Sequence, residues 1–98
     1  MSTFISLINY TDQGIKKIRK SPERLDTAKQ MLEEMGGKFV NFFLIMGEYD
    51  IVLVYEAPDD AISARFQLLL GEQGFVRSKT MKAFPETAYR ELITRLDQ

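Results

Sequence analysis

The sequence predicts a single α+β domain, in which a four-stranded antiparallel sheet carries two helices on one face. The chain has 98 residues, which is the length of one domain spanning residues 1–98. Two strongly apolar runs flank a short turn at residues 47–50, as expected of a β-hairpin. Segments with helical spacing precede and follow that hairpin, so the predicted order is β-α-β-β-α-β with one further helix at the end.

The first half of the chain is predicted to form a strand, a short helical segment and a longer helix. Residues 3–10 alternate loosely between apolar and polar side chains, which is typical of a strand. Residues 14–19 suit one or two helical turns. Ser21 can cap the next helix, Pro22 suits its first turn, and the glycines at 36–37 end it.

The second half continues with the hairpin and a second long helix. The hairpin is predicted over residues 38–56, and the acids in residues 58–60 favour a helix start that glycines at 71 and 74 bring to an end. Residues 75–84 form the last strand, and 87–96 the terminal helix. Right-handed crossovers then place the first and third strands in the middle of a ferredoxin-like sheet. The second strand lies at an edge or pairs with another chain.

The hairpin strands are apolar at consecutive positions, so both of their faces are expected to leave water. A domain of this size has too few helices to cover both faces of its sheet. We therefore expect a homodimer or higher oligomer that forms through the sheets and buries on the order of 2,000 Å² or more. The terminal helix carries enough apolar residues to cover an edge of the sheet or to cross to a neighbour.

Strict alternation along a strand predicts which side chains share a face. One set consists of Ser6, Ile8 and Tyr10. A second set consists of Phe39, Asn41, Phe43 and Ile45. The pattern leaves open which face of the sheet meets the helices.

The composition excludes several kinds of chemistry. The chain has no cysteine and no histidine, which excludes disulfides, thiolate or imidazole metal sites and a Ser-His-Asp triad. We expect no metal and no cofactor. The formal net charge of −1 gives no positive footprint for nucleic acid. No apolar run is long enough to span a bilayer or to serve as a leader, so we expect a cytoplasmic protein without a membrane partner.

The turn sequence Gly47-Glu48-Tyr49-Asp50 resembles the signature of the GYD-domain proteins. The rest of the chain is similar to that family in the same order. The similar segments are residues 10–15, 21–22, 56–60, 74–80 and 82–84.

This resemblance implies a protomer of the dimeric α/β-barrel group, in which two ferredoxin-like sheets pack face to face. It implies no established activity, since the group includes cofactor-free monooxygenases, haem enzymes and effector domains of regulators. One position departs from the family pattern: this chain has Phe75 where the family carries an asparagine. If that position lines a pocket, this member holds a different ligand or none.

The turn and a few polar strand residues are the candidate site. Gly47 can adopt a positive φ and Asp50 can accept backbone hydrogen bonds, so the motif has a purely structural interpretation. In the alternative, Tyr49 and Asp50 point into a cavity as catalytic groups. Candidate ligand-binding residues are Asn9, Asn41 and Arg77. The simpler explanation for these polar residues, which we favour, is solvent exposure at strand ends or interchain hydrogen bonding; the alternative is a polar pocket between the sheet and the helices.

Three functions remain open from the sequence. The first is a homo-oligomeric module that binds a small molecule or has a structural role. The second is a cofactor-independent, monooxygenase- or isomerase-like enzyme with a pocket near Tyr49 and Asp50. The third is an effector-sensing partner of a larger system that acts through its oligomer surface.

Overall fold

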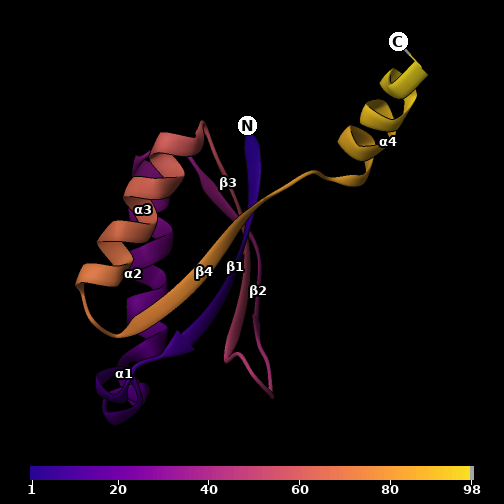
Figure 1. Ribbon diagram of the computed structural model, residues 1–98. Helices are drawn as coiled ribbons and strands as arrows, with labels where there is room; N and C mark the ends of the chain where they lie inside the picture. Colours follow the sequence, from indigo (N-terminus) through magenta and orange to yellow (C-terminus); the bar gives the residue numbers. More distant parts are fainter. Residues whose placement is uncertain (98) are drawn as a thin grey trace.

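The computed structural model describes residues 1–97 and confirms the predicted fold class. The described chain folds into four strands, four α-helices and two 3-10 turns (Figure 1). Their bounds are β1 Ser2–Tyr10, α1 Asp12–Lys16, η1 Ile18–Lys20, α2 Ser21–Glu34, β2 Lys38–Leu44, β3 Ile51–Ala57, α3 Asp60–Glu72, β4 Val76–Ala83, α4 Glu86–Thr94 and η2 Arg95–Asp97.

The strands form one antiparallel sheet in the order β2-β3-β1-β4. β1 and β3 therefore lie in the middle, as right-handed crossovers predicted, and β2 is an edge strand. In the register, Ile8 of β1 lies opposite both Ile51 of β3 and Ser78 of β4. The fold is ferredoxin-like, with α2 and α3 on one face of the sheet (Figure 1).

The core lies between α2, α3 and the sheet. The largest of its fully enclosed side chains are Leu32 of α2, Phe66 of α3, and Tyr55 of β3, each with no solvent exposure. The Tyr55 ring stacks on Phe4 at 5.5 Å and meets Phe66 edge to face at 5.3 Å. The predicted shared face of Ser6, Ile8 and Tyr10 is confirmed as the one that meets the helices, because Ser6 and Ile8 are buried there.

α2 ends as predicted and begins differently. Gly36 has φ of +90°, and the Gly37 N–H donates to the Leu32 carbonyl at 2.9 Å, which is the Schellman closure of a helix. The prediction that Ser21 caps α2 is wrong. η1 runs directly into α2, so Ser21 is already helical, and its hydroxyl instead contacts the Tyr10 hydroxyl at 3.1 Å.

β2 departs from the predicted alternation because it contains a β-bulge. Phe39 lies opposite Tyr55, whereas Asn41 lies opposite Val54, so Val40 is an extra residue in the strand. The prediction that Phe39 and Asn41 share a face is therefore wrong. Phe39 faces the helices and packs edge to face on Phe66 at 6.1 Å, while Asn41 is exposed beyond the bulge.

α4 stands apart from the rest of the molecule. Figure 1 shows it on the side of the sheet away from α2 and α3, at the end of the chain that leaves β4. The longest dimension is 53 Å, and the radius of gyration is 14.9 Å. A compact chain of this length has a radius of gyration near 13 Å, which is roughly the value for 100 residues. The structure thus consists of a compact body and an extended arm.

Candidate functional site

The face of the sheet opposite the helices has no cover within the described chain. Apolar side chains from its two middle strands form the centre of this open face. They are Ile5 and Leu7 of β1 and Val52 and Val54 of β3, all half-buried among their neighbours. Phe43 of β2, 54% exposed, and Met81 of β4, 48% exposed, extend the apolar surface to both edges. An apolar surface of this extent is typical of an interaction site.

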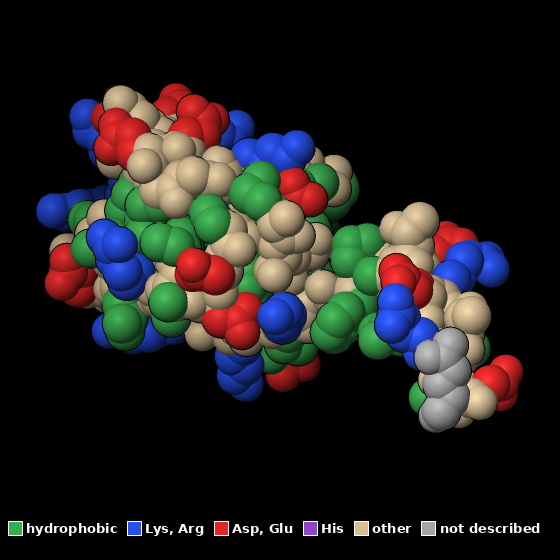
Figure 2. Space-filling view, turned by 90° about the horizontal axis from the view of Figure 1, so that it is seen from above, with side chains coloured by type: hydrophobic (Ala, Val, Ile, Leu, Met, Phe, Trp, Pro, Cys, Tyr) green, Lys and Arg blue, Asp and Glu red, His purple; other side chains and the backbone are tan. Residues whose placement is uncertain are grey.

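The arm carries a second apolar surface. Tyr89, Leu92 and Ile93 of α4 are 57%, 48% and 50% exposed. Figure 2 shows the arm as a lobe set apart from the body, with hydrophobic side chains where the two join. Apolar residues continue at the end of the β2–β3 hairpin, where Leu44 is 72% and Met46 99% exposed.

Asn9, Asn41 and Arg77 do not converge on one pocket. Asn9 lies directly opposite Arg77 in the sheet, and Asn41 lies beyond the bulge at the far edge. The Arg77 guanidinium donates to the carbonyls of Gly71 and Val76 at 3.1 and 3.0 Å, so it is engaged at the C-terminal end of α3. Ligand binding by these three residues stays a prediction.

The Asp50 carboxylate accepts a hydrogen bond from the backbone N–H of Tyr10 at 2.9 Å. Its own N–H donates to the Ile8 carbonyl, also at 2.9 Å. Asp50 thus joins the end of the hairpin to the end of β1. Gly47 has the positive φ, +122°, that the turn was expected to need. The Tyr49 ring lies 5.9 Å from the ammonium group of Lys79, at the rim of the open face.

Neither Tyr49 nor Asp50 lines either of the two cavities described below. The geometry of the turn matches its structural interpretation, and a catalytic role for this pair stays a prediction. Within residues 1–97, no group of three or more acidic side chains is placed to hold a metal ion. The described helices include none that is both long and apolar enough to cross a membrane.

A polar network lies between α3 and the sheet. The Gln67 amide donates to Ser6 Oγ at 3.0 Å and to the Tyr55 hydroxyl at 3.1 Å, and its oxygen accepts from Ser78 at 2.7 Å. Tyr55 also contacts Ser63 at 2.6 Å. Beside this network runs an open groove of about 550 Å³, where Lys82 pairs with Asp60 at 3.0 Å. The network occupies both the nitrogen and the oxygen of the Gln67 amide group, which indicates a structural role.

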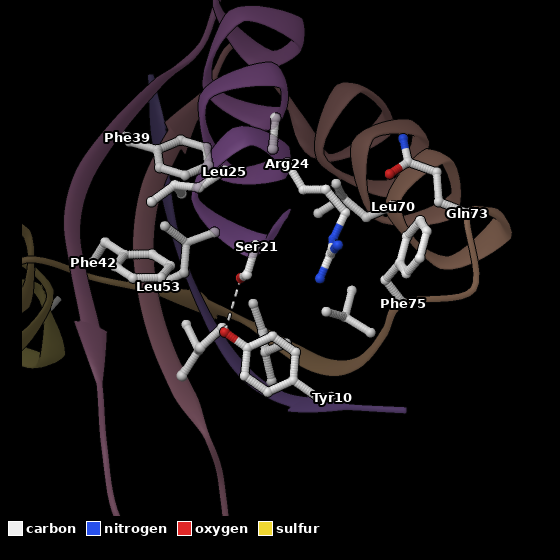
Figure 3. A pocket seen from close by; sticks show the side chains of 14 residues that line it. Tyr10, Ser21, Arg24, Leu25, Phe39, Phe42, Leu53, Leu70, Gln73 and Phe75 are labelled. Carbon is white, nitrogen blue, oxygen red and sulfur yellow. Dashed lines mark hydrogen bonds between the residues drawn. The ribbon is translucent and has the colours of Figure 1, made fainter. Parts of the chain in front are cut away.

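A smaller cavity of about 80 Å³ lies on the other side of the core, between α2 and the sheet (Figure 3). Most of its lining is apolar, including Phe39 and Phe42 of β2 and Leu70 of α3. Phe75, the position that departs from the family pattern, also lines this cavity. The sequence left open whether the position of Phe75 lines a pocket, and the structure shows that it does.

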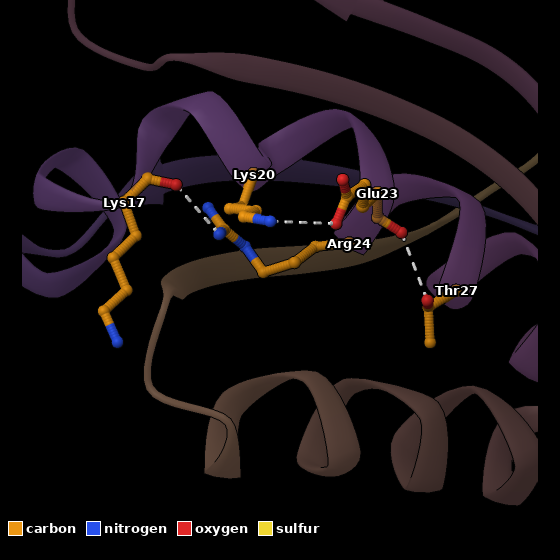
Figure 4. Close-up of polar contacts among 5 residues, drawn as sticks. All are labelled: Lys17, Lys20, Glu23, Arg24 and Thr27. Carbon is orange, nitrogen blue, oxygen red and sulfur yellow. Dashed lines mark hydrogen bonds and ion pairs between the residues drawn. The ribbon is translucent and has the colours of Figure 1, made fainter.

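Among the described residues, Arg24 is the one charged side chain that lines this cavity. Its Nη1 donates to the Lys17 carbonyl at 3.0 Å (Figure 4), and its guanidinium lies 4.2 Å from the centre of the Phe75 ring. Its Nη2 is buried and has no hydrogen-bond partner within the described chain. Sequence reasoning did not single out Arg24, because in the sequence it is one more charge in a helix that is mostly polar. Only the packing of the Phe75 ring against Arg24 distinguishes this arginine from the other charged residues of α2.

The fold and the open apolar face define a small ferredoxin-like protein whose sheet is covered on one side only within residues 1–97. The chain belongs to the GYD domain family, whose model matches residues 4–93. The chain is 40% identical over 97 residues to a protein of Thermus thermophilus, and this match spans 98% of the chain and 99% of the relative. That relative is named "Glutamine synthetase and cystathionine beta-lyase binding protein". No solved structure shows a significant match to the chain.

Proposed function

We propose that this protein is a protein-binding module that assembles with a second copy through its open sheet face and binds a larger enzyme. The observation that carries the proposal is the apolar centre of that face, formed by Ile5, Leu7, Val52 and Val54 without a covering helix in the described chain. Burying apolar area of this kind contributes roughly 25 cal/mol per Å², so an uncovered face favours association.

A second copy is the occupant that accounts for both unpartnered apolar surfaces together. Within one chain the centre of the open face is half-buried, and its edges and the apolar side of α4 are about half exposed. Two sheets packed face to face about a twofold axis would cover each open face with the other. The formal net charge of −1 places little electrostatic repulsion against this contact.

The arm fits the same assembly. α4 has nine residues, and isolated helices of that length are marginal in water. Its apolar side therefore needs a surface to dock on, and α4 already lies on the open side of the sheet (Figure 1). In the proposed dimer each arm passes beside the partner copy and packs its apolar side there.

Binding of a larger enzyme is supported by the name of the relative from Thermus thermophilus. Glutamine synthetase and cystathionine β-lyase are the first partners to test for this chain. In this proposal the exposed apolar end of the β2–β3 hairpin, at Leu44 and Met46, is the surface that contacts such a partner. A cytoplasmic location and the absence of nucleic-acid and membrane partners stay predictions. Small-molecule binding depends on a different part of the molecule, the cavity beside Arg24.

Self-association is tested by analytical ultracentrifugation over a dilution series. The test variant is Leu7→Glu, which places a charge in the centre of the open face. The matched control is Leu68→Glu, because Leu68 is 73% exposed on α3, on the opposite side of the molecule. We expect a dimer or larger assembly for the unmodified protein and the control, and a folded monomer for Leu7→Glu. A stable monomer of the unmodified protein at all concentrations would overturn the proposal.

Enzyme binding is tested with purified glutamine synthetase and cystathionine β-lyase from the organism that encodes this chain. Each enzyme is immobilised, and binding is measured by interferometry. The unmodified protein is compared with Met46→Ser, and Leu68→Ser serves as a matched control at an exposed apolar residue of α3 (73% exposed). We expect saturable binding to at least one enzyme, weakened at least about tenfold by Met46→Ser, which corresponds to about 1.4 kcal/mol. Absence of binding to both enzymes contradicts the partner assignment and leaves self-association standing on its own test.

A further inference from the structure

The cavity beside Arg24 combines an apolar body with one cationic nitrogen that lacks an acceptor within the described chain. The guanidinium is held in place at two points, by the bond from Nη1 to the Lys17 carbonyl and by the Phe75 ring 4.2 Å away. Figure 3 shows the guanidinium reaching into the cavity between Phe75 and Tyr10. Its Nη2 is buried, and no described residue accepts a hydrogen bond from it. A buried N–H of a charged group is costly to leave unpaired, so this nitrogen calls for an acceptor.

The charges around the cavity favour an anionic acceptor. No acidic side chain of residues 1–97 is among those that line it. The neighbouring carboxylate on the helix, Glu23, is instead 3.8 Å from the Lys20 ammonium group at the surface (Figure 4). Lys17 adds positive charge on the same side of the molecule (Figure 4). The charge of the Arg24 guanidinium is therefore not neutralised by any carboxylate of the described cavity lining, which favours binding of an anion.

A second donor is available in the cavity. The hydroxyls of Tyr10 and Ser21 are 3.1 Å apart, and either can be the donor of the bond between them. That bond uses one of their two hydroxyl hydrogens, so the other can donate to a ligand. A carboxylate has two oxygens, and an arginine fork paired with a nearby hydroxyl matches that geometry.

The volume of the cavity and its remaining lining determine the size and the apolar character of the rest of the ligand. A volume of about 80 Å³ holds more than one water molecule, for which roughly 10–15 Å³ suffices, and it excludes a drug-sized ligand. Beyond the polar groups the lining consists of aliphatic and aromatic side chains such as Leu25, Phe42 and Leu53. We propose that this cavity binds a short-chain aliphatic monocarboxylate, with its carboxylate at Arg24 Nη2 and its hydrocarbon tail against the sheet.

The probe is butanoate, and its neutral isostere butanamide is the ligand control. Both are titrated into the ¹⁵N-labelled full chain and followed by two-dimensional NMR. We expect saturable shifts with butanoate that centre on α2 and residues 75–76, and binding of butanamide at least about tenfold weaker. In Arg24→Met, which keeps the apolar stem, the preference for the acid over the amide is expected to disappear. Arg65→Met, at an exposed arginine of α3, is the matched control and keeps the preference.

Each alternative occupant has its own signature. If the cavity holds only water, neither compound gives saturable shifts, and the proposal is overturned. Equal affinity for acid and amide, or an acid preference that persists in Arg24→Met, also overturns it. If Arg24→Met does not fold, the side-chain nitrogen signals of Arg24 in the unmodified protein decide: they shift with butanoate and not with butanamide. These measurements use the protein alone, so their failure does not bear on the proposed enzyme binding.

Discussion

Asp50 accepts a hydrogen bond from the backbone of Tyr10, 40 residues earlier in the chain, across a distance of 2.9 Å. The regular pairing of β1 with β3 ends at Ile8 and Ile51. The Asp50 side chain therefore adds one hydrogen bond between β1 and the hairpin beyond the last regular pair of residues. The acid of the turn motif closes the sheet at the point where β1 gives way to α1.

Removing the hydrogen bond between Asp50 and Tyr10 is expected to lower the free energy of unfolding. A hydrogen bond to a charged group contributes roughly 1.5–3 kcal/mol, so Asp50→Ala should reduce the free energy of unfolding by that amount. Asp50→Asn keeps an oxygen that can accept the Tyr10 N–H and should cost less than half as much. Urea unfolding followed by circular dichroism measures both. Equal losses for the two variants would contradict the assignment of the hydrogen bond as the cause.

The polar network under α3 gives a second prediction. Tyr55→Phe removes the hydroxyl that contacts both Ser63 and Gln67 in a fully buried position. Leaving these partners unpaired should cost about 1–3 kcal/mol. For a domain of this size the melting temperature falls by roughly 4–8 °C per kcal/mol, which calorimetry can measure. The control is Tyr89→Phe, at a tyrosine that is 57% exposed. Its expected change is within about 0.5 kcal/mol.

Two glycines should respond to alanine in opposite directions. A Cβ at Gly14 would overlap the backbone carbonyl oxygen of Phe75, which accepts the Thr11 N–H at 3.0 Å. Gly14→Ala is expected to destabilise the protein, because that carbonyl must move and its hydrogen bond lengthens. A Cβ at Gly71 meets nothing within 4 Å in the described chain, and the residue is helical. Gly71→Ala should therefore stabilise by up to about 1 kcal/mol. Chemical denaturation of both variants settles the sign.

The arm should strengthen assembly without supporting the body. Ile93→Gln removes apolar area from the exposed side of α4, and Arg90→Gln changes its polar side as the matched control. In the proposed dimer only the first variant should raise the dissociation constant, by about tenfold or more. Sedimentation equilibrium measures this constant, while far-UV circular dichroism should show a folded body in both variants. If neither variant affects association, the arm packs elsewhere than on the second copy.

Most of the fold followed from local patterns in the sequence. The hairpin and the two long helices were predicted because apolar periodicity, acidic helix starts and glycine stops agree there, and the order of the strands followed from right-handed crossovers. The end of α2 at Gly36 shows this most clearly. The start of the same helix shows the limit. A serine before a proline indicates a cap, but η1 leads directly into α2 and leaves Ser21 free to contact Tyr10.

The candidate sites were less predictable because they depend on contacts between distant segments. The bulge at Val40 adds one residue to β2 and reverses the faces that strict alternation assigned after it. Arg24 gives no sequence signal of its own, since its position in the cavity depends on Phe75, which lies far along the chain, directly before β4. Phe75 itself was noticed only as a departure from the family pattern.

The bulge at Val40 has a consequence for the solubility of the protein. β2 is an edge strand that contains a run of β-prone residues, including Phe42 and Phe43, and its outer side faces no other strand of the described chain. Such an edge can act as a template for stacking of further strands into fibrils. The extra residue interrupts the regular spacing of the backbone groups along that edge and twists the strand. Deleting Val40 would restore an even edge, and we expect the variant to form amyloid-like deposits more readily than the unmodified protein.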